Sequence, residues 1–164
     1  MSWIAEAVHS AARELDSDYV SVLELTGDRR GLLVRGGFGF PEGVLGGVLP
    51  AGKENLPGYA LHSAEPVLIE DFSTEARFGP SPVQRDPGVV SALGAPIGAR
   101  SRQFGVIGAH SRSPNHFDSE DANFVQSRAN VLGAASSALA ARSSCATPRR
   151  AFVSWPTPRR RSCG

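Results

Sequence analysis

Four histidines could supply metal ligands or a general base, and their spacing tests both roles. A zinc site on a helix typically places two histidines four residues apart, and cysteine thiolates complete many such sites. His62, His110 and His116 contain no pair with that spacing, and neither cysteine is close in sequence. The sequence therefore predicts no metal site. It favours a structural or pocket-edge role for His110, which ends a strand, and a loop position for His116.

Serine and carboxylate side chains show no catalytic pattern either. Ser91 lies in the run GVVSALG, which lacks the Gly-x-Ser-x-Gly spacing that exposes a nucleophile between strand and helix. Glu70 and Asp71 follow a strand, and the acids from Asp118 to Asp121 open a helix, so they are read as solvated and capping groups. The sequence predicts that the protein is not an enzyme.

The glycine-rich run GGFGFPEG, which begins at Gly36, invites comparison with a dinucleotide-binding loop. Such a loop needs a third glycine where this chain has Glu42, and a helix must begin there. The run is therefore interpreted as a strand end and a turn.

Both cysteines, Cys145 and Cys163, stand near the end of the chain. Residues 1–142 thus contain no thiol for a disulfide, a thiolate-bound metal or a cysteine nucleophile. The segment 143–164 also holds five of the 17 basic residues and none of the 16 acidic ones, which leaves the rest of the chain at a formal charge of −4. This contrast separates an acidic folded part from a basic tail.

Length and composition indicate one globular domain. The chain has 164 residues, of which 41% are hydrophobic and 20% charged, a balance that can bury a core. No run of eighteen apolar residues occurs, and the N-terminus does not resemble a signal peptide. We therefore expect a cytoplasmic protein without a membrane partner.

The periodicity of apolar residues predicts the elements that must position these side chains. A helix is expected over residues 2–15, with Ser2 as its cap, and a second long helix from Asp118 onward. Strands are expected over residues 19–25, 32–34, 66–71, 89–97 and 104–110, with a short helix over 58–63 and loop-rich covers over 41–57 and 72–87. This order favours an α+β fold with an antiparallel sheet, the terminal helices on one face and the loops over the other.

Beyond Ala141 the helical pattern gives way to serine, proline and arginine. We therefore divide the chain into a domain of residues 1–142 and a disordered tail of residues 143–164. The tail combines arginines with Phe152 and Trp155, which are ingredients of nucleic-acid binding. Its composition favours an unstructured extension, and nucleic acid is not the expected partner.

Several stretches of the sequence resemble GAF domains. They are GYAL at residues 58–61 with EPVLIED at 65–71, VSALGAPIG at 90–98, FGVIGAH at 104–110, and FDSEDANF at 117–124. The order of elements matches as well, so the resemblance spreads over residues 4 to about 140, and it is greatest to GAF domains of bacterial sensor histidine kinases. The resemblance implies a PAS-like antiparallel sheet of five to six strands, a small-molecule pocket under the loops between Pro41 and Asp86, a homodimer through the terminal helices, and a kinase or other output domain as partner in a two-component system.

For that pocket we predict residues that should face or border the loop-covered side of the sheet. They are Leu61, Ile69, Phe72, Phe78, Leu93, Pro96 and His110. The ligand is not identified by the sequence. Haem bound through His110 or His62 and an empty pocket both stay open.

The sequence also departs from the family. Asn115, Phe117 and Asp121 only partly match the motif of cyclic-nucleotide-binding GAF domains, and bilin-binding relatives need a cysteine that residues 1–142 lack. Arg128 stands on the last helix where an aliphatic residue would suit a packed face, so its guanidinium must reach solvent or an acid. Three alternatives to a ligand sensor therefore stay open: a ligand-free dimerisation or interaction module, a truncated remnant of a sensor kinase, and a thiol-dependent reductase that uses Cys145.

Overall fold

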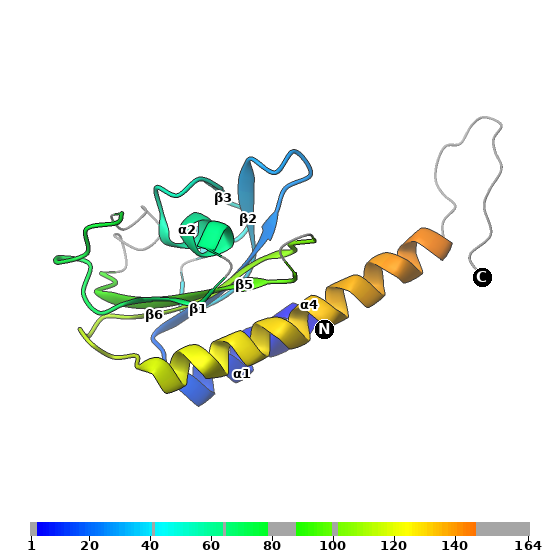
Figure 1. The fold of residues 1–164 in the computed structure, drawn as a ribbon. Helices are drawn as coiled ribbons and strands as arrows, with labels where there is room; N and C mark the ends of the chain where they lie inside the picture. The colour runs from blue at the N-terminus through cyan, green and yellow to red at the C-terminus, as the bar shows by residue number, and fades with distance from the viewer. Residues whose placement is uncertain (1–2, 41, 64, 79–87, 100–101, 147–164) are drawn as a thin grey trace.

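The computed structural model of this chain describes residues 3–40, 42–63, 65–78, 88–99 and 102–146 (Figure 1). The elements are α1 (Trp3–Leu15), β1 (Tyr19–Leu25), β2 (Gly31–Phe38), η1 (Glu42–Val44), β3 (Val48–Pro50), α2 (Leu56–Ser63), β4 (Val67–Ile69), β5 (Ser91–Ile97), β6 (Gly105–Ser111) and α4 (Ser119–Ala146). The strands form one six-stranded antiparallel sheet in the order β3-β2-β1-β6-β5-β4. The predicted α+β architecture is confirmed.

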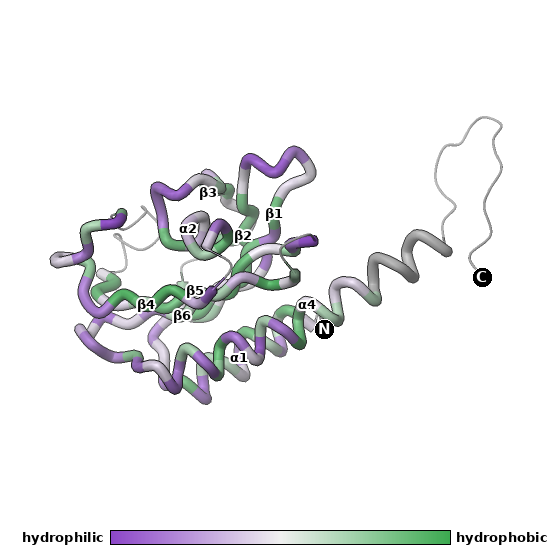
Figure 2. Tube along the Cα trace, in the orientation of Figure 1, coloured by the Kyte–Doolittle hydropathy of each residue, from purple (hydrophilic) through white to green (hydrophobic). Residues whose placement is uncertain are grey.

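The sheet separates two layers of packing. Helices α1 and α4 lie on one face and α2 lies on the other (Figure 1), while Figure 2 shows the most hydrophobic residues concentrated along the strands. The helix-side core consists of Ile4, Val8, Ala11, Ala12, Leu15, Val20, Val22, Leu93, Ala95, Ile97, Ile107, Ala109, Phe117, Val125, Ala129 and Leu132. The loop-side core consists of Tyr19, Leu23, Leu32, Val34, Ala51, Leu56, Ala60, Leu61, Val67, Ile69, Phe78, Val89, Ala92 and Val106.

Helix α1 follows the predicted apolar stripe and ends on a left-handed residue. Asp16 has a φ of 51°, and the Ser17 amide donates to the Ala12 carbonyl at 3.1 Å. Aspartate tolerates this conformation better than most residues, and the bond satisfies a carbonyl that the helix cannot. The chain thus turns sharply into β1. The predicted Ser2 cap lies outside the described residues.

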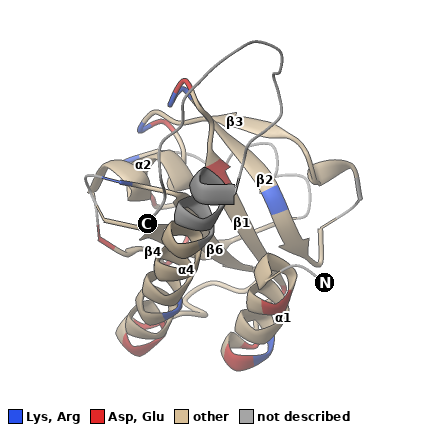
Figure 3. Ribbon diagram, turned by 90° about the vertical axis from the view of Figure 1, so that its right-hand side faces the viewer, with Lys and Arg blue, Asp and Glu red and all other residues tan. Residues whose placement is uncertain are grey.

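Helix α4 begins with a reciprocal cap, as the acidic run predicts. Asp118 Oδ1 accepts from the Asp121 amide, and Asp121 Oδ2 accepts from the Asp118 amide, each at 3.0 Å. Figure 3 shows the acidic residues at this end of α4, where their negative charges interact favourably with the positive end of the helix dipole. The helix continues to Ala146, four residues into the segment that the sequence assigns to the tail. Residues 147–164 lie outside the described part.

Arg128 of α4 contacts an aromatic ring and a hydroxyl rather than an acid. Its guanidinium lies 5.2 Å from the centre of the Phe124 ring, and Nη2 donates to Ser10 Oγ of α1 at 2.9 Å. The side chain thus joins the two long helices across their shared surface. This geometry resolves the expected cost of an arginine on the packed face.

Two elements differ from the sequence-based boundaries. Strand β3 lies inside the predicted loop 41–57, because backbone pairing of Leu49 with Leu32 of β2 creates a strand without any apolar alternation. Helix α2 begins at Leu56 rather than Gly58, since Asn55 Oδ1 accepts the Gly58 amide at 2.8 Å and caps the helix there. The predicted cover over residues 72–87 is described only as far as Phe78, and residues 79–87 lie outside the described part.

Candidate functional site

His110 is the most unusual polar residue on the loop-covered face. It lies on β6, four residues after Val106 of the loop-side core, so the two side chains share that face, and only 4% of His110 is exposed. Its Nε2 lies 3.4 Å from the hydroxyl of Ser21 on β1. Burial away from water lowers the pKa of His110 from 6.5 to about 4. The imidazole is therefore neutral at physiological pH.

Aromatic rings surround this histidine. The Phe40 ring meets the His110 ring edge-on, with centroids 5.5 Å apart, and stacks on Tyr19 at 4.9 Å. The Arg112 guanidinium lies 5.9 Å from the centre of the Tyr19 ring, and the carboxylate of Asp18 accepts the Arg112 amide at 2.8 Å. We call Tyr19, Ser21, Phe40 and His110 the histidine site.

A glycine allows the chain to pass so close to Tyr19. Gly39 follows β2 with a φ of 88°, and an added Cβ would lie 2.3 Å from the Asp18 carbonyl oxygen. Only glycine fits such a position, because a side chain there would meet backbone as well as an unfavourable φ. The predicted strand end and turn in this glycine-rich run is confirmed, and its role is to bring Phe40 onto Tyr19.

The chemistry available at the histidine site is apolar and aromatic contact plus hydrogen bonding from a neutral imidazole and a hydroxyl. Such a combination suits the recognition of a small molecule, where a few polar groups orient a ligand among apolar ones. Within the described residues, no three His, Cys, Asp or Glu side chains converge on a point where they could hold a metal ion. No described helix is long and apolar enough to span a membrane.

The structure places the predicted pocket residues in different surroundings. Leu61, Ile69 and Phe78 belong to the loop-side core, and Phe72 packs against it. Pro96 pairs with Val106, whereas His110 pairs with Ala92, so Pro96 lies four residues, or about 13 Å, along β5 from the histidine site.

Leu93 requires a correction. Its side chain belongs to the helix-side core, not to the loop-covered side. Ala92 of the same strand packs in the loop-side core, and neighbouring residues of a strand point to opposite faces. The neighbouring residue Ala92, and not Leu93, therefore faces the loop-covered side.

Sequence reasoning missed Tyr19, Ser21 and Phe40. The alternation of Tyr19–Leu25 could have placed the first two on the face opposite Val20 and Val22. Phe40 gave no local signal, since its contacts with Tyr19 and His110 come from a turn and a distant strand.

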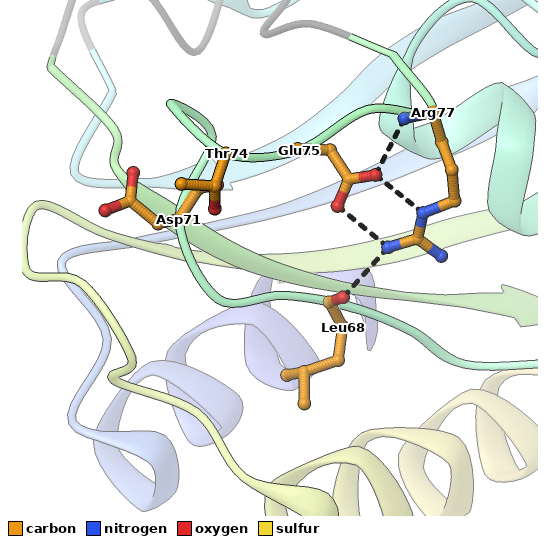
Figure 4. A network of polar contacts seen from close by, with 5 residues as sticks. All are labelled: Leu68, Asp71, Thr74, Glu75 and Arg77. Carbon is orange, nitrogen blue, oxygen red and sulfur yellow. Dashed lines mark hydrogen bonds and ion pairs between the residues drawn. The ribbon is translucent and has the colours of Figure 1, made fainter.

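A second polar arrangement closes the edge of the loop-covered face (Figure 4). Arg77 donates through Nε and Nη2 to the carboxylate of Glu75 at 2.6 and 2.9 Å, and Nη2 also donates to the Leu68 carbonyl of β4 at 3.1 Å. Its guanidinium lies 5.3 Å from the centre of the Tyr59 ring and 5.6 Å from that of Phe78. The hydrogen bond between the two side chains lowers the pKa of Glu75 and raises that of Arg77. Arg77 thus fixes the segment after β4 against both β4 and α2.

Removing this contact should loosen that segment. We expect Arg77→Ala to lower the free energy of unfolding by about 1 kcal/mol, because the hydrogen bonds are partly exposed and screened. Arg77→Lys should be destabilised nearly as much as Arg77→Ala, since a lysine cannot make the bidentate contact. Urea unfolding measures both, with Arg102→Ala at an exposed position as the control. Equal stability of Arg77→Ala and the control would contradict the assigned role.

A surface hollow of about 330 Å³ lies at the opposite end of β1. It is lined by Thr26, Gly27, Asp28, Arg30, Gly31 and Val48. Asp28 in this turn accepts from Thr26 Oγ1 at 2.6 Å and from the Arg30 amide at 3.0 Å. Its polar groups thus serve the turn itself, and the hollow contains none of the predicted pocket residues.

The fold and parts of the sequence are similar to those of known proteins. A model of the GAF domain family matches residues 3–136. The GAF domain of a phosphoenolpyruvate-protein phosphotransferase from Coxiella burnetii superimposes with a TM-score of 0.76 at 20% identity, covering 86% of this chain and 84% of that one. The second GAF domain of DevS from Mycobacterium smegmatis superimposes with a TM-score of 0.69 at 19% identity, covering 85% of this chain and 94% of that one. Free methionine-R-sulfoxide reductase from Neisseria meningitidis superimposes with a TM-score of 0.67 at 17% identity, covering 80% of this chain and 74% of that one.

At these identities the solved structures establish a shared fold and nothing finer. A search of curated protein sequences found no match. The family model covers most of the described residues, from the start of α1 to the middle of α4. This protein therefore belongs to the GAF domain family, whose members are typically sensory and regulatory domains.

Proposed function

We propose that this GAF domain binds a small molecule at the histidine site and transmits the binding event through its long helices, without catalysing a reaction. The observation that carries the proposal is a buried, neutral His110 placed among aromatic rings on the loop-covered face. A titratable group with a strongly shifted pKa beside apolar and aromatic surface is a candidate binding residue, and the Ser21 hydroxyl lies within hydrogen-bond reach of it. Leu61, Ile69, Phe72 and Phe78 would contribute apolar surface on the same side.

The positions of the cysteines support a binding role over the reductase alternative. Cys145 lies in the last turns of α4, which extends past the sheet on the face opposite the histidine site (Figure 1). Cys163 lies outside the described residues. Residues 1–142, which include all the described strands, contain no cysteine. A thiol-dependent reduction needs a thiolate at the substrate.

We also propose that the domain forms a homodimer through α4. Val131 is 63% exposed, the highest value among the large exposed hydrophobic residues in the part of the chain that the structure describes. Ser127, Ala134 and Ala138 are exposed too, and their spacing of three and four residues puts all four side chains on one stripe of the helix. Pro50 in β3 and the Arg77 contact with Leu68 in β4 obstruct pairing at the two sheet edges. These features favour helix packing between two copies.

A charge on this stripe should prevent the association. We expect Val131→Asp to convert a dimer of the full chain into monomer at micromolar concentration, because the carboxylate would be buried without a partner. Ser137→Asp, which adds the same charge about 120° around the helix from Val131, should leave the dimer intact. Native mass spectrometry reads the subunit number directly. A dimer that survives Val131→Asp would contradict the proposed interface.

The same spectra test ligand binding. Protein purified from its expression host should carry a reproducible extra mass that denaturation releases, and His110→Leu should lose it while keeping the far-ultraviolet circular dichroism of the parent. An absorbance spectrum distinguishes a chromophore such as haem from a colourless molecule. A species with no extra mass under any loading condition would favour the ligand-free interaction module.

That second candidate has one structural observation in its favour. Helix α2 sits directly on β5, where an added Cβ on Gly94 would lie 3.3 Å from the Leu56 side chain. Leu56 and Ala60 thereby occupy part of the space between α2 and the loop-covered face of the sheet. The kinase partner and the cytoplasmic location stay predictions of the sequence.

A further inference from the structure

We infer that the turn between β5 and β6 links helix α2 to helices α1 and α4, so that a shift of α2 displaces the long helices and the reverse. The linking turn is defined by Gly98, Ala99 and the residues from Arg102 to Phe104. It contacts α2 on the loop-covered face and both long helices on the other face. The contacts belong to three different residues and can be tested one at a time.

The contact with α2 is a hydrogen bond to the helix end. Gln103 Nε2 donates to the Leu61 carbonyl at 2.7 Å, and Gln103 Oε1 lies 3.4 Å from Arg29 Nη2 of the β1–β2 turn. The last carbonyls of a helix have no partner within the helix, so this side-chain amide satisfies one of them. Because Leu61 is also buried in the loop-side core, α2 and the linking turn must keep their relative position.

The contact with α4 is backbone against backbone. A Cβ added at Gly133 would lie 2.9 Å from the Gly98 amide nitrogen and 3.0 Å from the Gly98 Cα atom. Such distances leave no space even for a methyl group, and neither partner is a flexible side chain. The helix therefore rests directly on the linking turn, and neither can move toward the other.

The contact with α1 is aromatic. The Phe104 ring lies 5.8 Å from the Trp3 ring, and both residues pack against the helix-side core. The backbone of Phe104 is held on both sides, since its amide donates to the Ile97 carbonyl and its carbonyl accepts from the Leu25 amide, each at 2.8 Å. Trp3 thus lies at the point where a displacement of the turn would reach α1.

The linking turn is rigid enough to transmit a displacement. Gly98 has a φ of 97°, and a Cβ there would lie 2.7 Å from the Arg102 carbonyl oxygen. The Arg102 amide donates to the Ala99 carbonyl at 2.8 Å and closes the turn. This hydrogen bond, together with the two backbone hydrogen bonds of Phe104 to Ile97 and Leu25, ties the described part of the turn to the sheet and limits how far it can shift on its own. A displacement at Gln103 is therefore passed to Gly98 and Phe104.

This inference rests on the proposed function only for the event that starts the movement, namely ligand binding at the histidine site. The mechanical link itself needs no ligand. Its test therefore uses substitutions alone in the full chain, so a failure of the link and a failure of ligand binding give separate results.

The experiment measures hydrogen exchange in Gly133→Ala, with Ser137→Ala, an exposed substitution one turn away, as the matched control. The added methyl must separate α4 from the linking turn and strain the bond from Gln103 to Leu61. We expect exchange of the amides at the C-terminal end of α2 to accelerate about tenfold, as the loss of one hydrogen bond predicts. Amides of the β1–β2 pair should keep the rates of the control.

A second variant tests the link from the other side. Gln103→Ala removes a half-buried side chain and should leave the fold intact. In a Trp155→Phe background, Trp3 is the sole tryptophan, and we expect its emission maximum to shift as Phe104 moves. Uniform acceleration across the sheet in Gly133→Ala, or exchange of α2 equal to the control together with an unchanged Trp3 emission in Gln103→Ala, would overturn the inference.

Discussion

Gly105→Ala should destabilise the protein by about 3 kcal/mol or more and leave much of it unfolded at 37 °C. Gly105 opens β6 opposite Glu24 in the central pair of strands. A Cβ added there would lie 1.8 Å from the Leu23 carbonyl oxygen and 3.0 Å from the Glu24 Cα atom. Both are backbone atoms of β1, so the strands must separate where Leu23 and Val22 anchor the two cores. Typical domains have only about 5 to 15 kcal/mol of stability in total.

Gly27→Ala provides the matched control. Gly27 lies in the β1–β2 turn, and no atom beyond its neighbours lies within 4 Å of the Cβ that alanine would add. Urea unfolding followed by circular dichroism gives the two free energies in the same buffer. The midpoint of Gly27→Ala should stay near that of the parent. A Gly105→Ala protein with parental stability would show that the sheet does not have the spacing described for β1 and β6.

The stability of the protein should fall with acidification because of one residue. His110 has a pKa of about 4 in the folded state against 6.5 ordinarily, since burial disfavours its charged form. Between these values the unfolded chain binds a proton that the folded chain does not, so stability is greatest above pH 6.5 and is lost as the pH falls toward 4. The full loss is about 3 kcal/mol, of which about 1.4 kcal/mol falls between pH 8 and pH 5.5.

The contribution of His110 is measured as a difference between pH profiles. Carboxylates also titrate as the pH approaches 4, so the comparison is made from pH 8 to pH 5.5, by urea unfolding of the parent and of His110→Phe and His110→Gln. Both replacements lack a titrating group, and both should lose about 1.4 kcal/mol less than the parent over this range. Their stabilities at pH 8 need not agree, because the phenyl ring and the amide pack differently beside Ser21 and Phe40. Parallel profiles for the three proteins would contradict the burial of a neutral histidine.

Long and periodic segments were predictable because local preference and packing agree in them. The apolar stripe of α1 and the alternation of Tyr19–Leu25 match the structure, and the cap of α4 follows from Asp118. Strand β3 was not predictable, because it exists only through its pairing with β2. Leu93 was predicted on the wrong face of the sheet for a related reason, because a shift of one residue along a strand moves a side chain to the opposite face.

The sequence by itself determined the family, the antiparallel sheet with the terminal helices on one face, and the position of His110 near the end of a strand. These properties depend on residue types and spacing within single segments. Only the tertiary structure decided that Phe40 and Tyr19 surround His110, that Arg77 holds the segment after β4, and that Gly98 and Gly133 bring the linking turn onto α4. Each of these contacts joins residues from separate segments, and their distances are set by how the strands pair and the helices pack, which no local pattern encodes.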